Sequence, residues 1–531
     1  MKSNKSIEMD QNTITSLLDK LNNRSLDEED YELIKLIIAT VVNVNMELVK
    51  KNISIQRLRK LFNIKTEKST NILPEKEKVN KEKSGEKYDK KEKKGHGRMS
   101  SHCYSSAEKV FIKNESLKPG DNCPACLKGK LYNNIPDGVF VKIKASPPFQ
   151  ATMYIQEKLR CNLCGKIYTA EWPKDVEKVK YEAGVSAMIA LLKYGSGFPF
   201  YRIGVLQGNL EVPIPPSTQW DIISEAVKNV FPVYEQLVFM AAQGEVIYND
   251  DTNMKVLSLM KENKSRKPSE RKGIFTTRII SKVEGKEIAL YYTGRNHSGE
   301  NITELLQNRL HTKGAPIQMC DALSRNPPKE LETILSNCLT HGRRNFVDLI
   351  DNFPLECEYV IIKLASVYHA DSVAKETNMT IEERLSYHQK ESGPLMAELK
   401  SWMENQIEDK KVEPNSGLGG AIQYMLNHWE KLTLFLKVAG APLDNNIVER
   451  ALKRAILNRK NAMFYKTENG ARVGDIFMGI IETCNLGKIN SYKYLVALQK
   501  YANAVKENPS AWLPWNFETA FRREKRKTGQ V

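Results

Sequence analysis

Apolar residues recur with a heptad spacing between Asp27 and Ile64. Two heptad positions are largely apolar: Ile34, Val41, Leu48, Ile55 and Phe62 fill one, and Ile37, Val44 and Leu58 fill the other. A period of 3.5 residues predicts a helix that pairs with a copy of itself as a coiled coil. Asn45 and Asn52 dilute the apolar stripe, so an amphipathic helix packed on its own chain is the alternative.

The pattern is lost between residues 65 and 98, which hold very few apolar side chains and end in "KKEKKGHGR". A charged segment that cannot bury a core predicts a solvated linker. The alternative is a basic arm that lies along a groove of DNA.

Helical periodicity returns at residues 176–243. The stretch "FPFYRIGVLQGNLEVPIPPSTQWDIISEAV" reads as helix, turn and helix, with Ser217 or Thr218 as the cap of the second helix, because the prolines before it exclude a helix. Such a pair can read DNA as a helix-turn-helix. Two helices packed within a bundle give the same pattern, and we favour that interpretation.

Alternating patterns typical of β-strands follow. "GEVIYNDD", "GIFTTRIISKV" and "KEIALYYTG" predict three consecutive antiparallel strands. "SGENITELLQNRL" then predicts a helix, "APIQMCDAL" a fourth strand and "PPKELETILSN" a further helix. This β-β-β-α-β-α order is that of an RNase H-like sheet. Residues 345–439 read as helical and strandless, which in that fold is an insertion.

The charge balance indicates a polyanionic partner. Lys and Arg number 80 against 64 Asp and Glu, a net charge of +16, which favours nonspecific attraction to phosphates. Nucleic acid is the first expectation and a membrane surface the second. No apolar run approaches the roughly 20 residues of a membrane span, and the N-terminus lacks the apolar stretch of a signal peptide. We therefore expect a cytoplasmic protein that does not enter a membrane.

Two CxxC pairs, Cys123 with Cys126 and Cys161 with Cys164, predict a metal site. Each pair places two sulfurs on one tight turn, and four thiolates in a tetrahedral array suit one structural Zn²⁺ ion. The long spacer between the pairs leaves room for a β-hairpin. Nine cysteines used in this way indicate a reducing compartment and no structural disulfide. A purely structural module and one that also contacts DNA both remain open.

The expected fold is a multidomain α+β protein with an RNase H-like core interrupted by an all-helical insertion. An N-terminal coiled-coil helix, a zinc ribbon and a helical DNA-binding segment precede the core. The expected parts are an N-terminal helical region at 1–64, a basic linker at 65–102, a zinc-binding domain at 103–175, a helical segment at 176–243, the first part of the core at 244–344, the insertion at 345–440, the second part of the core at 441–500 and a basic tail at 501–531.

Carboxylates stand at the ends of two predicted strands. "VIYNDDTNMKV" carries Asp250 and Asp251, and because neighbouring side chains of a strand point to opposite faces, only one can enter a site above the sheet. "PIQMCDALSRN" carries Asp321 on the adjacent strand, and Glu449 is the lone acid of the basic stretch "NNIVERALKRAILNRKN". Taken singly, each has an ordinary interpretation as a turn residue or, for Glu449 with Lys453, a surface ion pair.

Adjacent carboxylates repel one another unless cations occupy the gap. Two Mg²⁺ ions about 3.5–4 Å apart, or Mn²⁺ in their place, would neutralise Asp250, Asp321 and Glu449 and align a water or a 3′-hydroxyl against a phosphodiester. Amide and basic side chains of the same helix would hold the DNA phosphates: Asn446, Arg450, Lys453, Arg454, Arg459 and Lys460.

These stretches, in this order, resemble the DDE transposases of the insertion-sequence-66 family, and the resemblance runs through nearly the whole chain. The helix ending in "LRKLFNIKTEKS" looks like the family's leucine-zipper region, the CxxC pairs look like its zinc-binding domain, and "STQW" resembles the segment before its catalytic core. "NNIVERALKRAILNRKNAMF" is similar to the family's Asn-Asn…Glu-Arg…Arg-Lys-Asn signature. "LPWNF" is a weaker match.

The resemblance places the family's catalytic Asp, Asp and Glu on Asp250, Asp321 and Glu449. "CLTHGRRNF" is similar to the family's Cys-x-x-His-x-Arg-Arg-x-Phe motif. This implies that three further residues support the metal site or the DNA backbone: His341, Arg343 and Arg344. A buried histidine on a strand is the alternative for the first of them.

The sequence departs from the family pattern at two places. Asp251 stands where Glu is usual, and the aromatic-rich stretch usual after Asp321 is reduced to "ALSRN". Neither departure removes a carboxylate of the expected metal site.

The resemblance implies Mg²⁺-dependent hydrolysis at transposon ends, followed by attack of the freed 3′-hydroxyl on target DNA, without a covalent protein–DNA intermediate. It also implies a homodimer or larger assembly on paired terminal inverted repeats, and accessory proteins of the same element as partners. Two other functions remain open: a catalytically inactive DNA-binding protein or regulator of the same ancestry, and an RNA-directed nuclease that cleaves a hybrid.

Overall fold

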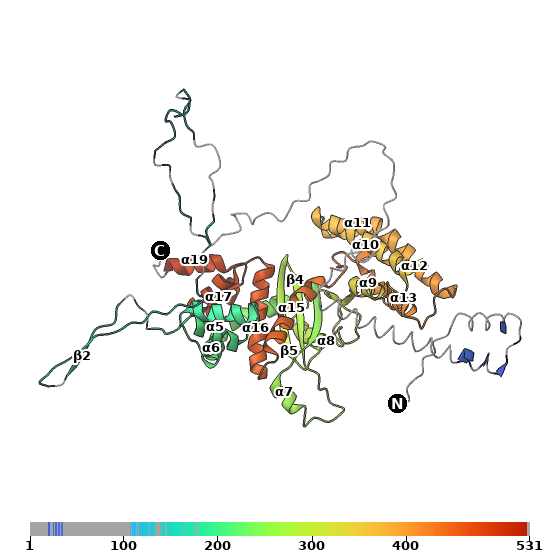
Figure 1. The fold of residues 1–531 in the computed structure, drawn as a ribbon, viewed down its shortest axis with the longest axis horizontal. Coiled ribbons are helices and arrows are strands. Elements are labelled where there is room, and N and C mark those ends of the chain that lie inside the picture. The colour runs from blue at the N-terminus through green and yellow to red at the C-terminus, as the bar shows by residue number, and fades with distance from the viewer. Residues whose placement is uncertain are drawn as a thin grey trace. The chain divides into compact units, whose positions relative to one another are not determined.

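Figure 1 shows the computed structural model of the chain, which describes residues 20–21, 25, 27–28, 30–31, 33–35, 107, 109–112, 114, 116–126, 128–132, 139, 141–143, 146–164, 166–174, 176 and 178–527. The side chains of residues 449–451 and 454 also lie outside the description. Most of the predicted coiled coil and the whole of the predicted linker at 65–102 fall outside these residues. Among the residues described, no helix is both long and apolar enough to cross a membrane.

The chain forms two compact units, residues 1–79 with 350–365, and residues 80–349 with 366–531. The described part of the first unit includes Lys20, whose ammonium group lies 3.1 Å from a carboxylate oxygen of Asp27 and 3.0 Å from one of Asp30. The sheet and all the candidate site residues belong to the second unit.

A five-stranded mixed sheet forms the centre of the second unit. Its strand order is β5-β4-β3-β6-β7, with bounds β3 Val246–Asn253, β4 Phe275–Val283, β5 Lys286–Gly294, β6 Ile317–Cys320 and β7 Ile334–Asn337. β3, β4 and β5 pair antiparallel, whereas β6 pairs parallel with both β3 and β7. The four strands predicted from apolar alternation are confirmed.

The helix predicted for "PPKELETILSN" is wrong. Ile334–Asn337 forms β7, with Ile334 opposite Ile317 of β6, and the residues before it form turns and bends. Ser336 and Asn337 are buried against the neighbouring strand. Pairing with β6 therefore overrides the weak helical propensity of the Lys-Glu-Leu-Glu stretch.

Helices cover both faces of the sheet. α15 (Asn446–Ala462) and α16 (Glu468–Leu486) pack on one face, where α15 lies across the strands in Figure 1. α6 (Pro216–Ala242) and α8 (Ser298–Leu306) pack on the other face. The apolar core lies between the sheet and these helices.

Further helices and a hairpin lie before, within and after the sheet region of the chain. Before the sheet stand β1 Lys158–Arg160, β2 Ile167–Thr169, α4 Ala183–Ala190, the π-helix η2 Leu191–Gly195 and α5 Phe200–Asn209. α7 Leu257–Glu262 connects β3 to β4. Between β7 and α15 the chain forms α9 Leu339–Val347, α10 Pro354–Glu376, α11 Ile381–Glu391, α12 Gly393–Glu408, α13 Gly417–Asn427, α14 Trp429–Leu432 and η3 Leu434–Leu436. After α16 come α17 Ser491–Lys500, α18 Ala502–Glu507, η4 Pro509–Trp512 and α19 Phe517–Lys527.

The predicted cap of α6 is wrong. The helix begins at Pro216 with Pro215 as its N-cap, and no side chain caps it, so Ser217 and Thr218 lie inside its first turn. Proline suits the first helical position because it has no N–H group to satisfy and its φ is already helical.

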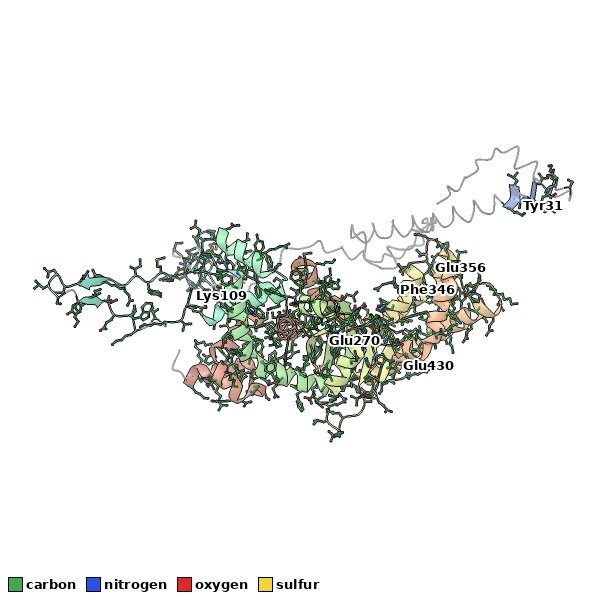
Figure 2. The ribbon with its side chains drawn as sticks, turned by 90° about the horizontal axis from the view of Figure 1, so that it is seen from below. Tyr31, Lys109, Glu270, Phe346, Glu356 and Glu430 are labelled. Carbon is green, nitrogen blue, oxygen red and sulfur yellow. The ribbon has the colours of Figure 1, made fainter. Side chains whose placement is uncertain are left out.

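The helices between β7 and α15 have an apolar core of their own. Phe346 of α9, labelled in Figure 2, is fully buried, as are Leu399 of α12 and Leu418 and Ile422 of α13. The buried carboxylate of Asp371 forms ion pairs with Lys375 at 2.5 Å and Arg384 at 2.8 Å, and it lies 3.4 Å from Nε2 of His388.

Another buried carboxylate ties α16 to the sheet. Asp475 accepts hydrogen bonds at 2.7 Å from both the backbone N–H and the hydroxyl of Thr293 on β5. Burial raises the pKa of Asp475 from its ordinary value of 3.8 to about 7, although both bonds lower it.

We expect Asp475→Asn to remove a pH dependence of stability. Because the folded pKa lies above the unfolded one, the folded state holds its proton more tightly, and stability present at low pH is lost as the pH rises towards 7. The neutral amide should abolish this loss and raise the free energy of unfolding at pH 8 by on the order of a few kcal/mol over wild type. Urea unfolding at pH 5 and pH 8 measures the effect. A difference between variant and wild type that stays the same at both pH values would contradict it.

Candidate active site

Two aspartates come together at the end of the parallel strand pair. Tyr248 of β3 pairs with Met319 of β6, and two residues further along each strand stand Asp250 and Asp321. Side chains two positions apart on a strand share a face, so both carboxylates lie at the same level and on the same face. Neighbouring strands are about 5 Å apart, so we expect these carboxylates to lie close together.

The carboxylate of Asp251 points to the opposite face. It accepts hydrogen bonds from the hydroxyl of Thr277 at 2.7 Å and from the backbone N–H of Ser298 at 3.1 Å, and it lies 3.4 Å from Nδ1 of His297. Its side chain is 2% exposed. Asp251 therefore joins β3 to β4 and to the start of α8, on the face opposite Asp250, although its charge also raises the pKa of Asp321.

Asp321 is held by its neighbours. The amide of Asn326 donates to Oδ1 of Asp321, and the backbone N–H of Leu323 donates to the same oxygen at 3.4 Å. Burial raises the pKa of Asp321, and the nearby His341 and Arg325 counteract part of the rise. These contacts fix the orientation of the carboxylate before any ligand is bound.

α15 begins beside Asp250. Asn445, the residue before the helix, donates from its amide to the backbone carbonyl of Asn249 at 2.9 Å, and its backbone N–H donates to the sulfur of Cys338 at 3.3 Å. Glu449 follows one helical turn later. Its side chain, like those of Arg450 and Arg454, lies outside the described part of the structure, so only its place on the helix is given.

The other predicted residues of α15 differ in their surroundings. Lys453 and Lys460 are exposed. The amide of Asn446 donates to Asp444 at 2.8 Å. Arg459 donates to the hydroxyl of Thr252 at 3.1 Å, so it ties α15 to the end of β3.

His341, Arg343 and Arg344 lie on α9, which starts directly after Cys338. The interpretation of His341 as a histidine on a strand is therefore wrong. Its effect on the pKa of Asp321 places it near that carboxylate. Arg343 is buried, with 8% of its surface exposed.

Arg278 was missed by sequence reasoning, although a charge inside the apolar run "GIFTTRIISKV" is a visible signal. It lies directly opposite Asp250 on the neighbouring strand and is fully buried. Its guanidinium donates to the carbonyl of Val448 on α15 at 3.5 Å and to Glu482 on α16 at 3.3 Å. Arg278 thereby joins the strand next to Asp250 to the turn that carries Glu449.

Each CxxC pair forms a tight turn. The backbone N–H of Cys123 donates to the carbonyl of Gly129 at 2.7 Å, and that of Cys161 donates to Lys166 at 2.9 Å at the end of the β1–β2 hairpin. Backbone N–H groups, chiefly that of Gly129, lower the pKa of Cys126, which favours a thiolate. Within the described residues, however, no three His, Cys, Asp or Glu side chains are gathered as a metal would require, so the two turns are not joined into one site.

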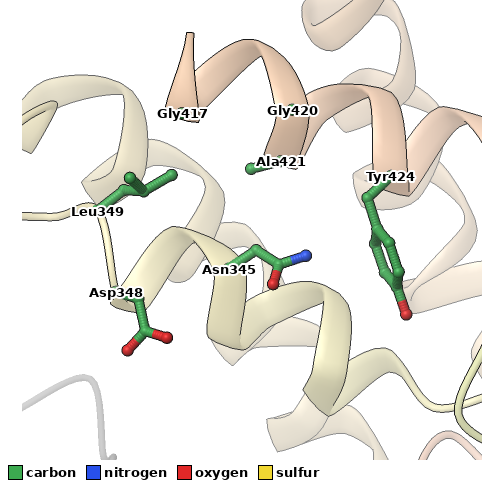
Figure 3. A pocket seen from close by; sticks show the side chains of 7 residues that line it. All are labelled: Asn345, Asp348, Leu349, Gly417, Gly420, Ala421 and Tyr424. Carbon is green, nitrogen blue, oxygen red and sulfur yellow. The ribbon is translucent and has the colours of Figure 1, made fainter. Parts of the chain in front are cut away.

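An open hollow lies between α9 and α13 (Figure 3). It has a volume of about 340 Å³ and is lined by Asn345, Asp348, Leu349, Gly417, Gly420, Ala421 and Tyr424. Burial, followed by the charge of Asp321, raises the pKa of Tyr424 to about 12. The described lining of the hollow includes a single carboxylate, and the paired carboxylates at the sheet end therefore remain the candidate site.

The family model that matches this chain covers residues 178–473 and describes the transposase IS66 family. This match takes in the whole sheet, both aspartates and α15. The chain belongs to the IS66 transposase family. It is thus a transposase-like protein, as its sequence motifs predicted.

Proteins of Sinorhizobium fredii are similar to this IS66 family member. The uncharacterized protein y4hP is 24% identical over 432 residues, which span 76% of this chain and 75% of the relative. The uncharacterized protein y4jD is 32% identical over 189 residues, 35% of this chain and 36% of that protein.

Proposed function

We propose that this protein is an active DDE transposase that cleaves DNA at the ends of a bacterial insertion sequence and joins the freed ends to target DNA. The observation that supports the proposal is the parallel pairing of β3 with β6, which places Asp250 and Asp321 each two residues beyond the paired Tyr248 and Met319, near the start of the helix that bears Glu449. The order of three antiparallel strands, a helix and a parallel fourth strand supports an RNase H-like core.

The residues at the sheet end fit a pair of divalent cations. Asp250 and Asp321 offer hard oxygen ligands side by side, and Mg²⁺ prefers carboxylate oxygens. We assign Asp250, Asp321 and Glu449 as the ligands of two Mg²⁺ ions, for which Mn²⁺ can substitute. Bound Mg²⁺ would polarise the phosphodiester and activate the attacking water or 3′-hydroxyl.

The surrounding side chains position these ligands and the DNA. Asn326 orients the Asp321 carboxylate, and Asn445 sets the start of the Glu449 helix against β3. Lys453 and Lys460, exposed on that helix, would bind phosphate oxygens by charge. His341 would support the Asp321 side of the site.

Zinc is proposed as a structural cofactor of the region before the core. The turn geometry and the lowered pKa of Cys126 suit thiolate ligands, and Zn²⁺ would hold the two turns together through Cys123, Cys126, Cys161 and Cys164.

The purified protein should contain about one zinc per chain, and Cys161→Ser should reduce this towards zero, because a four-ligand structural site does not survive the loss of a ligand. Plasma emission spectrometry of the protein after dialysis measures it. Cys103→Ser, outside both pairs, should leave the zinc content unchanged. Equal zinc content in wild type and Cys161→Ser would reject the assignment.

The proposed partners are the terminal inverted repeats and target DNA, a second copy or more of the chain, and the accessory proteins of the same element, all in the bacterial cytoplasm. The direct test mixes the protein, its accessory proteins and duplex terminal repeats with Mg²⁺ or Mn²⁺ and follows nicking and joining on gels. Nicking at the repeat ends followed by joining is expected. Binding without nicking would favour an inactive regulator, and cleavage of an RNA–DNA hybrid without end specificity would favour a nuclease.

A further inference from the structure

A strongly basic segment leaves the sheet directly after β3. Residues 255–272, "KVLSLMKENKSRKPSERK", connect β3 to β4 and include α7; we call them the β3–β4 arm. The arm has seven basic residues and two acidic ones, Glu262 and Glu270. The basic residues are Lys255, Lys261, Lys264, Arg266, Lys267, Arg271 and Lys272.

Neither acid of the arm pairs with the ammonium group of a lysine in the arm. Glu262 forms an ion pair with Arg295 at 3.1 Å. Glu270, labelled in Figure 2, accepts the backbone N–H of Lys267 at 2.8 Å. Arg271 pairs with Glu300 of α8 at 2.5 Å. The other six cations of the arm form no ion pair with any residue that the structure describes: Lys255, Lys261, Lys264, Arg266, Lys267 and Lys272.

Hydrogen bonds brace the arm from inside. The guanidinium of Arg295, which follows β5, donates to the carbonyl of Leu259 at 3.1 Å and to the side chain of Asn263 at 2.6 Å. The amide of Asn263 in turn donates to the carbonyl of Lys272 at 2.7 Å. A single buried arginine side chain, 15% exposed, thus holds both sides of the arm, and less conformational entropy remains to be lost on binding a partner.

The root of the arm follows the strand that carries Asp250. Lys255 stands five residues after Asp250 and two residues beyond the end of β3, within about 16 Å of extended chain. The backbone of Tyr465, just after α15, bonds to both Lys255 and Leu257, at 2.8 and 2.9 Å. The arm is therefore fixed to the end of the same helix that bears Glu449, and Figure 1 shows α7 and its loop extending beyond the sheet.

We propose that the β3–β4 arm binds the phosphate backbone of duplex DNA, beside the strands that the site cleaves. The inference rests on the proposed function for the identity of the partner. Exposed cations without carboxylate partners, held on a braced loop, are suited to bind DNA phosphates. Such contacts depend on charge and not on base sequence. The arm therefore adds affinity for any duplex and holds the DNA near Asp250.

Charge reversal on the arm tests the proposal. In the full-length protein, K264E/K267E is compared with K286E/K313E, which reverses two exposed lysines at the other end of the sheet, one at the first residue of β5 and one before β6. Fluorescence anisotropy with a terminal-repeat duplex and a shuffled duplex, without Mg²⁺, gives the affinity between about 50 and 200 mM salt. K264E/K267E should weaken binding to both duplexes at least about tenfold at the lower salt and reduce the salt slope by about two, since each lost phosphate contact removes about 0.9.

The control K286E/K313E should keep the slope of wild type, and both variants should keep its thermal melting temperature. An unchanged slope for K264E/K267E, or equal losses in the two variants, would overturn the proposal. Because binding is measured without Mg²⁺, this failure is distinct from failure of the proposed function, in which wild-type protein binds the duplex but never nicks it with the metal present.

Discussion

Asp250→Asn is expected to abolish Mg²⁺-dependent nicking and strand transfer while leaving DNA binding intact. The amide keeps the shape of the side chain but removes the negative charge that the proposed metal site requires. Loss of a charge that stabilises the transition state costs on the order of 10²–10³-fold in rate or more. Gel assays of nicking and joining, with anisotropy for binding, measure the two effects separately.

Asp251→Asn is the matched control, because the same substitution is made one residue away on the opposite face. Asp251 is buried and bonded to Thr277 and Ser298, so its amide should lower the free energy of unfolding by about 1–3 kcal/mol. Strand transfer by the Asp251→Asn protein should depend on Mg²⁺ concentration as it does in wild type. If Asp250→Asn retained strand transfer, or if Asp251→Asn abolished it as well, the assignment of Asp250 as the metal ligand would fail.

Arg278→Met is expected to destabilise the second unit severely. Its guanidinium is fully buried between Glu482 and the ring of Tyr291, whose centroid lies 5.2 Å away. Removing one partner of a buried ion pair leaves the other charge uncompensated and costs about 3–5 kcal/mol. Val448 also loses its donor, which loosens the first turns of α15 where Glu449 stands. Urea unfolding of the variant and wild type gives the difference.

A double-mutant cycle separates the ion pair from simple packing. In the wild type the amide of Asn485 donates to the Glu482 carboxylate at 3.3 Å. E482Q removes the charge of Glu482, and the side-chain oxygen of the new amide can still accept this bond. R278M/E482Q should therefore be more stable than the sum of the two single losses predicts, by about 1 kcal/mol or more. Purely additive losses would show that Arg278 acts through packing alone.

The antiparallel strands could be predicted from the sequence because apolar alternation is a local signal. The opposite orientation of Asp250 and Asp251 follows from the same alternation, and the contacts of Asp251 with Thr277 and Ser298 agree with it. β7 could not be predicted in this way. Its four residues gain their stability from pairing with β6, and the local sequence around Glu330 and Leu331 favours a helix.

Some long-range features of the site required the structure. The RNase H-like order of elements predicted that the strands of Asp250 and Asp321 would be neighbours, and the parallel pairing of β3 with β6 agrees with it, but no local pattern encodes such a contact. The same holds for Asn445, whose amide reaches Asn249. Arg278 carried a signal, a charge within an apolar strand, but its partner Glu482 lies in a distant helix. The sequence predicted helix α15 itself but did not predict that it packs on β3.

The central claim is that Asp250, Asp321 and Glu449 bind the same pair of metal ions. A crystal structure of the protein with a terminal-repeat duplex and Mn²⁺ tests it directly, since anomalous scattering locates the ions. We expect Mn²⁺ peaks within about 2.0–2.3 Å of carboxylate oxygens from all three residues. Mn²⁺ bound elsewhere, or Glu449 directed into solvent away from both aspartates, would contradict it.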